Sequence, residues 1–417
     1  MIKGNFVFAP RLGELTTLEH GALLLDDDGT VRDVLAAPPE GCDAEVIDCG
    51  EMLVMPSFVD MHLHAPQYPM LGMGMDLPLI DWLNAYTFRT EARFADADYA
   101  RRTYRRLARD LITGGTTRVC MFSSLHADAT LILMEELERA GVTGYVGKVN
   151  MDRNSGDTLR ETTEESKRET LRWLDACGQF RHVKPILTPR FTPSCTDELM
   201  AWLGKLADER GLPVQSHLSE NDDEIAWVRE LHPDCAQYWE TYDKYGLWKD
   251  RTVMAHCVHS DAREREALLR HNVVVAHCAD SNLNVYSGVA PIRTMLREGV
   301  WVTLGSDIAG GAALAMNQVI TMSIRASKIL HMQTGGEAEC LDVDEAYYLG
   351  STAGHRYFGA DGGFARGMPL HAIAVDDGVF AEPVRPLTLR ERFERSIYLM
   401  DKSAVKAVWS EGRQVVG

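Results

Sequence analysis

The 417-residue sequence lacks several features that define common protein classes. No apolar run approaches the roughly 18 residues that a helix needs to cross a bilayer. Residues 1–6 lack the charged-then-apolar layout of a signal peptide. None of the nine cysteines forms a C-x-x-C pair, and their scattered spacing favours reduced, buried thiols over a disulfide framework. We therefore expect a cytoplasmic protein without a membrane partner.

Acidic residues outnumber basic residues. The chain contains 61 Asp and Glu and 43 Lys and Arg, which gives a net charge of −18. Such a chain repels phosphate backbones, which argues against a nucleic-acid partner. The absence of H-E-x-x-H excludes a zincin protease, and the absence of H-x-E followed by P-C-x-x-C excludes the small zinc fold that deaminates cytidine. No G-x-S-x-G elbow, P-loop or G-x-G-x-x-G is present.

The apolar residues that are present, 45% of the chain, suffice for a sizeable core, and their pattern changes after residue 64. Residues 1–56 contain short strand-like runs and tight turns, without need of a helix. Beyond them, helices expected near 96–113, 162–176 and 197–210 alternate with short apolar strands. Eight strands are expected, the first before His62 and the others near residues 117–122, 144–149, 183–188, 213–216, 252–255, 273–276 and 301–305.

Eight β/α units predict a closed parallel (β/α)8 barrel of the TIM type over residues 57–362. Residues 363–417 lose helical periodicity and return to short strands near 372–375 and 404–409. We expect this segment to pair with residues 1–56 in a small β-sandwich, so that the barrel is inserted into that domain.

Metal-capable side chains follow several of the predicted barrel strands. His62 and His64 lie at positions i and i+2, and alternate residues of a strand point to the same side. His217, His256 and Asp307 come at or just after the ends of the fifth, sixth and eighth strands. Because the carboxyl ends of barrel strands line one mouth, we expect these side chains to meet there. Imidazole and carboxylate ligands suit Zn²⁺, or Fe²⁺ in a similar geometry.

Three further residues near these strand ends need an interpretation. Glu220 comes three residues after His217, where a carboxylate can turn back over the metal and take a proton from water. Its alternative role is an acidic residue in the first turn of the helix that begins near residue 221. Both roles can hold together. We interpret His277 as structural and His259 as a loop residue.

These motifs resemble the amidohydrolase superfamily, and within it the guanine deaminase family, over almost the whole length. The stretches that carry the resemblance include His64-Ala65-Pro66-Gln67-Tyr68, Asp76-Leu77-Pro78-Leu79, Thr188-Pro189-Arg190-Phe191, Ser216-His217-Leu218-Ser219-Glu220-Asn221 and Gly305-Ser306-Asp307-Ile308. Binuclear members usually bridge two metals with a carboxylated Lys at the end of strand four. This chain has Pro189-Arg190-Phe191 there, so one metal per chain is expected.

The resemblance also implies a role for each site residue. The expected zinc ligands, with Fe²⁺ possible instead, are His62, His64, His217 and Asp307. The expected catalytic residues are Glu220 and Asp307, which shuttle protons, and His256, which contacts the attacking water. The purine would be held by Gln67, Arg190 and Phe191, together with His217 and Glu220. The implied reaction converts guanine to xanthine and ammonia, and the implied assembly is a homodimer.

Alternatives remain open at this point. A sister deaminase would act on another aminated heterocycle, such as 8-oxoguanine, a pterin or a triazine. A hydrolase of the dihydroorotase kind would need two metals and would open a ring without releasing ammonia. A catalytically inactive scaffold would usually have lost metal ligands. One departure from the family pattern, Asp280, adds a carboxylate near the expected mouth that can alter substrate preference.

Overall fold

The computed structural model describes residues 1–41, 45–156 and 159–417, and within them eight parallel strands form a barrel. Strands such as the one at Val274–His277 are buried on both faces, which explains their continuous apolar sequences. In chain order the barrel strands are β5 (Phe58–His64), β6 (Thr116–Phe122), β7 (Thr143–Gly147), β9 (Val183–Pro185), β11 (Gln215–Leu218), β12 (Val253–His256), β13 (Val274–His277) and β14 (Trp301–Leu304).

Backbone hydrogen bonds close these strands into a ring. Neighbouring strands pair in parallel in two groups of four, and a bridge between Leu187 and Val214 joins the groups at one side. At the other side the amide of Asp307 donates to the carbonyl of His62 over 2.8 Å, and the amide of His64 donates to Ile308 over 3.1 Å. The predicted TIM-type barrel is therefore confirmed.

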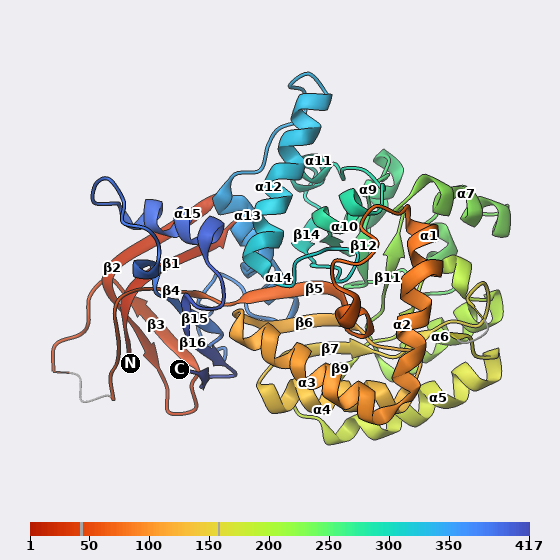
Figure 1. Ribbon diagram of the computed structural model, residues 1–417, viewed down its shortest axis with the longest axis horizontal. Helices are drawn as coiled ribbons and strands as arrows, with labels where there is room; N and C mark the ends of the chain where they lie inside the picture. Colours follow the sequence, from red (N-terminus) through yellow and green to blue (C-terminus); the bar gives the residue numbers. More distant parts are fainter. Residues whose placement is uncertain (42–44, 157–158) are drawn as a thin grey trace.

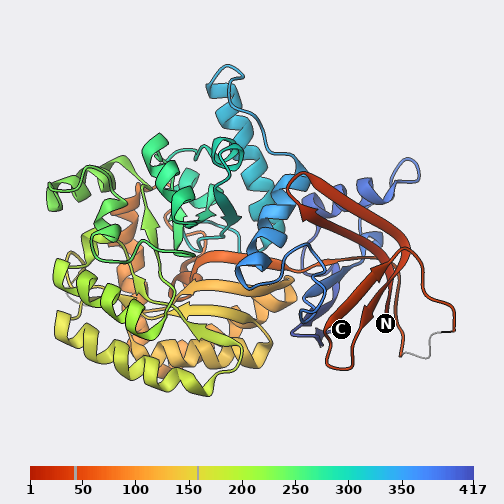
Figure 2. The same cartoon turned by 180° about the vertical axis from the view of Figure 1, so that it is seen from behind.

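Helices cover the outside of the barrel (Figures 1 and 2). The three helices expected from the sequence are present, and their caps explain where they start. Asp96 accepts hydrogen bonds from the amides of residues 98 and 99, and Thr162 and Glu165 form a capping box. The helices on and around the barrel are α3 (Ala97–Thr113), α4 (Ala127–Ala140), α5 (Thr163–Ala176), α6 (Asp197–Arg210), α7 (Asp222–Leu231), α8 (Glu240–Asp243), α9 (Ala262–Arg270), α10 (Ala279–Asn284), α11 (Ile292–Arg297), α12 (Met316–Gln333), α13 (Val343–Gly350) and α14 (Thr352–Tyr357).

The two terminal segments share one seven-stranded sheet beside the barrel, where both chain ends lie (Figure 1). The segments meet where Met55 pairs antiparallel with Ile373. Alternate residues serve opposite faces, since Phe6 packs into a small core of the sheet while Val7 packs into the main core. The sheet order is β17 (Arg413–Val416), β16 (Val405–Ser410), β15 (Ala372–Val375), β4 (Ile47–Pro56), β1 (Ile2–Arg11), β2 (Glu14–Leu25) and β3 (Val31–Leu35).

The expectation that the C-terminal segment contains strands alone is wrong, because it also forms helix α15 (Leu389–Leu399). Leu389, Phe393 and Ile397 are buried at intervals of four residues, which places them on one face of the helix. Thr388 and Glu391 form a capping box at its start. The periodicity is short and lies between charged residues, so it did not stand out in the sequence.

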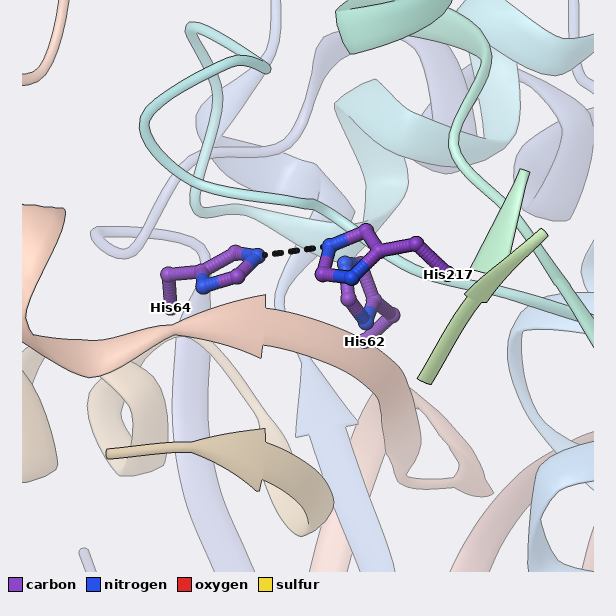
Figure 3. A group of neighbouring side chains, drawn as sticks. All are labelled: His62, His64 and His217. Atoms are coloured by element: carbon purple, nitrogen blue, oxygen red, sulfur yellow. Dashed lines mark hydrogen bonds between the residues drawn. The ribbon is translucent and has the colours of Figure 1, made fainter. Parts of the chain in front are cut away.

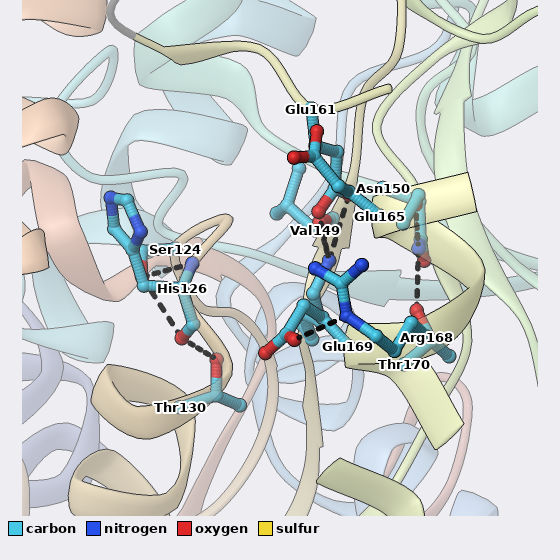
Figure 4. Close-up of polar contacts among 12 residues, drawn as sticks. Ser124, His126, Thr130, Val149, Asn150, Glu161, Glu165, Arg168, Glu169 and Thr170 are labelled. Atoms are coloured by element: carbon cyan, nitrogen blue, oxygen red, sulfur yellow. Dashed lines mark hydrogen bonds and ion pairs between the residues drawn. The ribbon is translucent and has the colours of Figure 1, made fainter. Parts of the chain in front are cut away.

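Strand four is interrupted shortly before Arg190. The predicted strand at 183–188 divides into β9 and β10 (Thr188–Pro189), which pairs with β8 (Val149–Asn150). Asn150 also donates to the hydroxyls of Ser166 and Thr170, each over 2.8 Å, so β8 is tied to α5 (Figure 4). A buried ion pair between Lys148 and Glu161, with Nζ–Oε1 at 2.8 Å, fixes the same region.

The eight cysteines in the described residues are free thiols, and six of them are buried. Cys42 lies outside the described residues. A search of the described helices finds none that is long and apolar enough to cross a membrane.

Candidate metal and active site

Four barrel strands bring the predicted metal-capable side chains to one mouth. His62 and His64 come from β5, His217 from β11, His256 from β12, and Asp307 from the turn after β14. All five are at least nine-tenths buried. Possible ligand atoms of His62, His64 and His217 lie within 4.8 Å of one another, as do those of His62, His256 and Asp307. Figure 3 shows the three histidines that face one another in this group.

The distances within the group fit a single small cation. Nε2 of His64 lies 3.2 Å from Nε2 of His217, and Oδ1 of Asp307 lies 3.2 Å from Nε2 of His62 and 3.4 Å from Nε2 of His64. Zinc bonds of about 2.0–2.1 Å in a tetrahedral site place two ligand atoms about 3.3 Å apart. The residues present therefore fit one divalent metal ion.

The protonation of His217 supports the same conclusion. Its Nδ1 lies 2.6 Å from the backbone carbonyl of Arg190, which can only accept, so Nδ1 carries the proton. The lone pair of neutral His217 then sits on Nε2 and points at His64. Burial, followed by the neighbouring histidines, holds the pKa of both His64 and His217 well below 6.5, and neutral imidazole is the form that binds metals.

Glu220 and His256 lie beside this donor set. Nε2 of His256 is 3.5 Å from Oε2 of Glu220 and 3.8 Å from Oδ2 of Asp307. Burial, and then the charge of Asp307, raises the pKa of Glu220 well above 4.5, so this carboxylate accepts a proton readily. Glu220 precedes α7, whose first turn holds residues 222–224, so the alternative role in a helix turn does not apply.

Asn282 is a site residue whose role the sequence reasoning missed. Its Oδ1 accepts a hydrogen bond from Nδ1 of His256 over 2.9 Å, which turns Nε2 of His256 towards Glu220. The backbones of His256 and Asp307 hold positive φ angles of 74° and 45°, uncommon for such residues and frequent at functional sites. The position of Asn282 in the sequence does not by itself reveal which histidine it contacts.

A cavity opens onto the metal-capable residues. The predicted purine-binding residues Gln67, Arg190 and Phe191 all line it. Leu79 and Trp82 supply apolar walls that the sequence reasoning did not assign. A cavity with apolar walls and a few convergent polar groups suits a flat heterocycle.

Glu91, on helix α2 (Phe88–Ala92), is a second residue that the sequence reasoning missed. Its Oε2 lies 2.7 Å from Nη1 of Arg190, and its Oε1 accepts a hydrogen bond from Nε2 of Gln67 over 2.9 Å. Nothing local in the sequence links Glu91 to Arg190.

Three other residues take structural positions. Asp280 accepts a hydrogen bond from the amide of Ala312 over 2.7 Å and does not line the cavity. His277 is buried, and burial lowers its pKa to about 3, so its ring is neutral. His259 lies outside the helices and strands and contacts the carbonyl of Ser287 over 2.9 Å.

Comparison with known proteins agrees with this geometry. The model of the amidohydrolase family matches residues 53–415, and the chain belongs to this family. Guanine deaminase of Dictyostelium discoideum is 35% identical, over 100% of this chain and 98% of that protein. Guanine deaminase of Homo sapiens is 37% identical, over 87% of this chain and 82% of that protein.

A solved structure extends the similarity to three dimensions. The crystal structure of guanine deaminase from C. acetobutylicum, with bound guanine in the active site, has a TM-score of 0.95 and 41% identity, over 99% of each chain. The resemblance to guanine deaminases is confirmed, and the chain is an enzyme of the hydrolytic deaminase type.

Proposed function

We propose that the protein is a zinc-dependent guanine deaminase that hydrolyses guanine to xanthine and ammonia. The observation that carries this proposal is one cavity that joins the His and Asp donor set to Gln67, Arg190 and Phe191. The solved relative that binds guanine in its active site supports the same substrate. Zinc is proposed because three imidazoles and one carboxylate suit its coordination chemistry.

The proposed zinc ligands are His62, His64, His217 and Asp307. When bound, zinc would act as a Lewis acid and lower the pKa of a water molecule. Glu220 takes a proton from the attacking water, and the oxygen of that water bonds to the ring carbon that carries the amino group. His256 accepts a hydrogen bond from the attacking water through Nε2, because its Nδ1 proton is held by Asn282.

The remaining steps return the protons. Glu220 gives its proton to the ring nitrogen, and Glu220 and Asp307 then move the proton of the added hydroxyl onto the amine. The carbon–nitrogen bond breaks, ammonia leaves, and the carbon keeps the oxygen of water as a carbonyl, which gives xanthine. Arg190 donates to the exocyclic oxygen of the purine, and Phe191 packs beside the ring.

We also propose that the enzyme is a cytoplasmic homodimer that takes a small purine as its substrate.

An assay of ammonia release over guanine, 8-oxoguanine, isoguanine, a pterin and a triazine tests the proposal. We expect guanine to react fastest, with one zinc per chain by elemental analysis and activity lost on chelation. His217→Ala is the matched inactive variant, because it removes one proposed ligand. Faster turnover of another heterocycle would replace guanine as the substrate, and two metals with ring opening would indicate a cyclic-amide hydrolase.

A further inference from the structure

Glu91 is completely buried next to the cavity and divides its two carboxylate oxygens between the two polar purine-binding residues. One oxygen lies 2.7 Å from Nη1 of Arg190, and the other accepts from Nε2 of Gln67 over 2.9 Å. A carboxylate is an acceptor without donors, so each partner must present a donor to it.

This contact fixes the orientation of the Gln67 amide. Its Oε1 accepts a hydrogen bond from the backbone amide of Ala309 over 3.0 Å, while its Nε2 faces Glu91. A reversed amide would place its oxygen against the Glu91 carboxylate and its NH₂ against the amide of Ala309. Both contacts would be repulsive. The second N–H of Gln67 is therefore a donor that the side chain can offer to a ligand, in addition to the remaining lone pair of Oε1.

The same carboxylate holds Arg190 in place. The guanidinium is buried, lies 5.5 Å from the centre of the Phe88 ring, and pairs its charge with Glu91. A guanidinium carries five N–H donors and no acceptor, so it retains donors beyond the one that faces Glu91. Gln67 and Arg190 both line the cavity, and each retains N–H donors for a ligand.

We infer that Glu91 is a positioning residue that sets substrate selectivity by keeping Gln67 and Arg190 as donors towards the cavity. Rings that present oxo groups or unprotonated nitrogens at this side are accepted, and rings that present amino groups there are rejected. A buried donor left without a partner discriminates by up to about 10⁴–10⁵ in kcat/KM. This inference rests on the proposed guanine deaminase activity, because it concerns the same site.

The decisive variant is Glu91→Gln, which keeps the size of the side chain but introduces a donor and removes the charge. Gln67 can then turn over, and Arg190 loses its anchor. We expect kcat/KM for guanine to fall about 100-fold, mainly through KM. For 2,6-diaminopurine, which has an amino group in place of the oxygen, kcat/KM should stay within threefold. The preference for guanine then falls at least tenfold.

Glu136→Gln is the matched control. Glu136 is also buried and paired with arginines, at 3.2 Å from Arg101 and 2.9 Å from Arg139, but it lies on α4 and does not line the cavity. We expect this variant to keep the preference for guanine. Glu91→Asp, which retains the charge for Arg190 with a shorter reach to Gln67, is the second variant, and its preference should fall between wild type and Glu91→Gln.

Binding of xanthine, measured by calorimetry, separates this inference from the proposed activity. Xanthine keeps the oxygen that Arg190 would contact, and we expect its Kd to rise at least tenfold in Glu91→Gln while the metal content stays unchanged. Wild-type activity with unaltered selectivity and xanthine affinity in both Glu91 variants would overturn the role of Glu91 alone. A wild-type chain that binds xanthine but leaves guanine unreacted would overturn the activity alone, and one that does neither would overturn both.

Discussion

The backbone carbonyl of Arg190 accepts a hydrogen bond from Nδ1 of His217 over 2.6 Å. The side chain of the same arginine pairs with Glu91, with Nη1 and Oε2 2.7 Å apart. One residue, directly after strand four, thus fixes the tautomer of a proposed metal ligand and supplies a donor for the proposed purine. Its two functions use different atoms, so a change of side chain should separate them.

Arg190→Ala should retain the metal and lose stability. The carbonyl that holds His217 remains, whereas the Glu91 carboxylate is left buried without its cation. Removal of one partner of a buried ion pair costs about 3–5 kcal/mol of unfolding free energy. We expect a lower melting temperature, partly restored in Arg190→Ala combined with Glu91→Gln, with metal content at the wild-type value. Loss of metal from the single variant would contradict the division of roles.

Glu220→Gln should keep the metal and lose turnover, because Glu220 is not among the proposed ligands but is the proposed proton carrier. Removal of a general acid–base group typically costs 10²–10⁴-fold in rate. Ammonia release and metal content of the same preparation provide the measurement. Near-normal turnover would remove Glu220 from the mechanism.

Asn282→Ala should slow turnover by roughly 10- to 100-fold, the range seen when an outer partner of a site histidine is removed. The change frees Nδ1 of His256, so its ring no longer holds Nε2 towards Glu220. Asn284→Ala, on the same helix, is the control, since Asn284 donates to the carbonyl of Gly310 over 2.9 Å. Equal rates in the two variants would show that orientation of His256 is unimportant.

Glu264 should make stability depend on pH. Burial raises its pKa to about 7 from 4.5, although hydrogen bonds from Ser260 and Ser219 favour the charged form. Between these two pKa values the folded chain keeps a proton that the unfolded chain loses. The contribution of Glu264 to the free energy of unfolding is therefore complete below pH 4.5 and is lost as the pH rises to about 7. Glu264→Gln cannot lose a proton. Its free energy of unfolding should therefore rise relative to that of wild type by up to about 1.4 kcal/mol per pH unit over this interval.

Melting temperatures of wild type and Glu264→Gln at pH 5, 6, 7 and 8 test this prediction. Glu266→Gln, an exposed position on the same helix, should show no such trend. A difference between wild type and Glu264→Gln that stays constant with pH would contradict the raised pKa.

Much of the site was predictable because barrel geometry brings strand ends together. His62, His217 and Asp307 could be placed at one mouth as soon as eight β/α units were recognised. Glu91 and Asn282 could not be placed in this way, because their roles depend on contacts between elements distant in sequence. Glu91 lies on the short helix α2, and no local pattern specifies which strand end faces it.

The helix at 389–399 was missed for a different reason. Its capping box and its buried residues at intervals of four were present in the sequence, but strands flank it on both sides. The interruption of strand four was also missed, because an apolar run does not show that Thr188 pairs with Val149 beyond the break. Local patterns predicted the kind of element well and the partner of each element less well.

The seam of the barrel runs between two of the proposed ligands, where the amide of Asp307 donates to the carbonyl of His62. The donor set cannot assemble until the chain has been made as far as Asp307, because its ligands come from both the first and the last strand of the barrel. An ion bound there would link the first strand of the barrel to the last. Binding of the ion and closure of the barrel would then occur together. Loss of the ion would destabilise the barrel first at this seam.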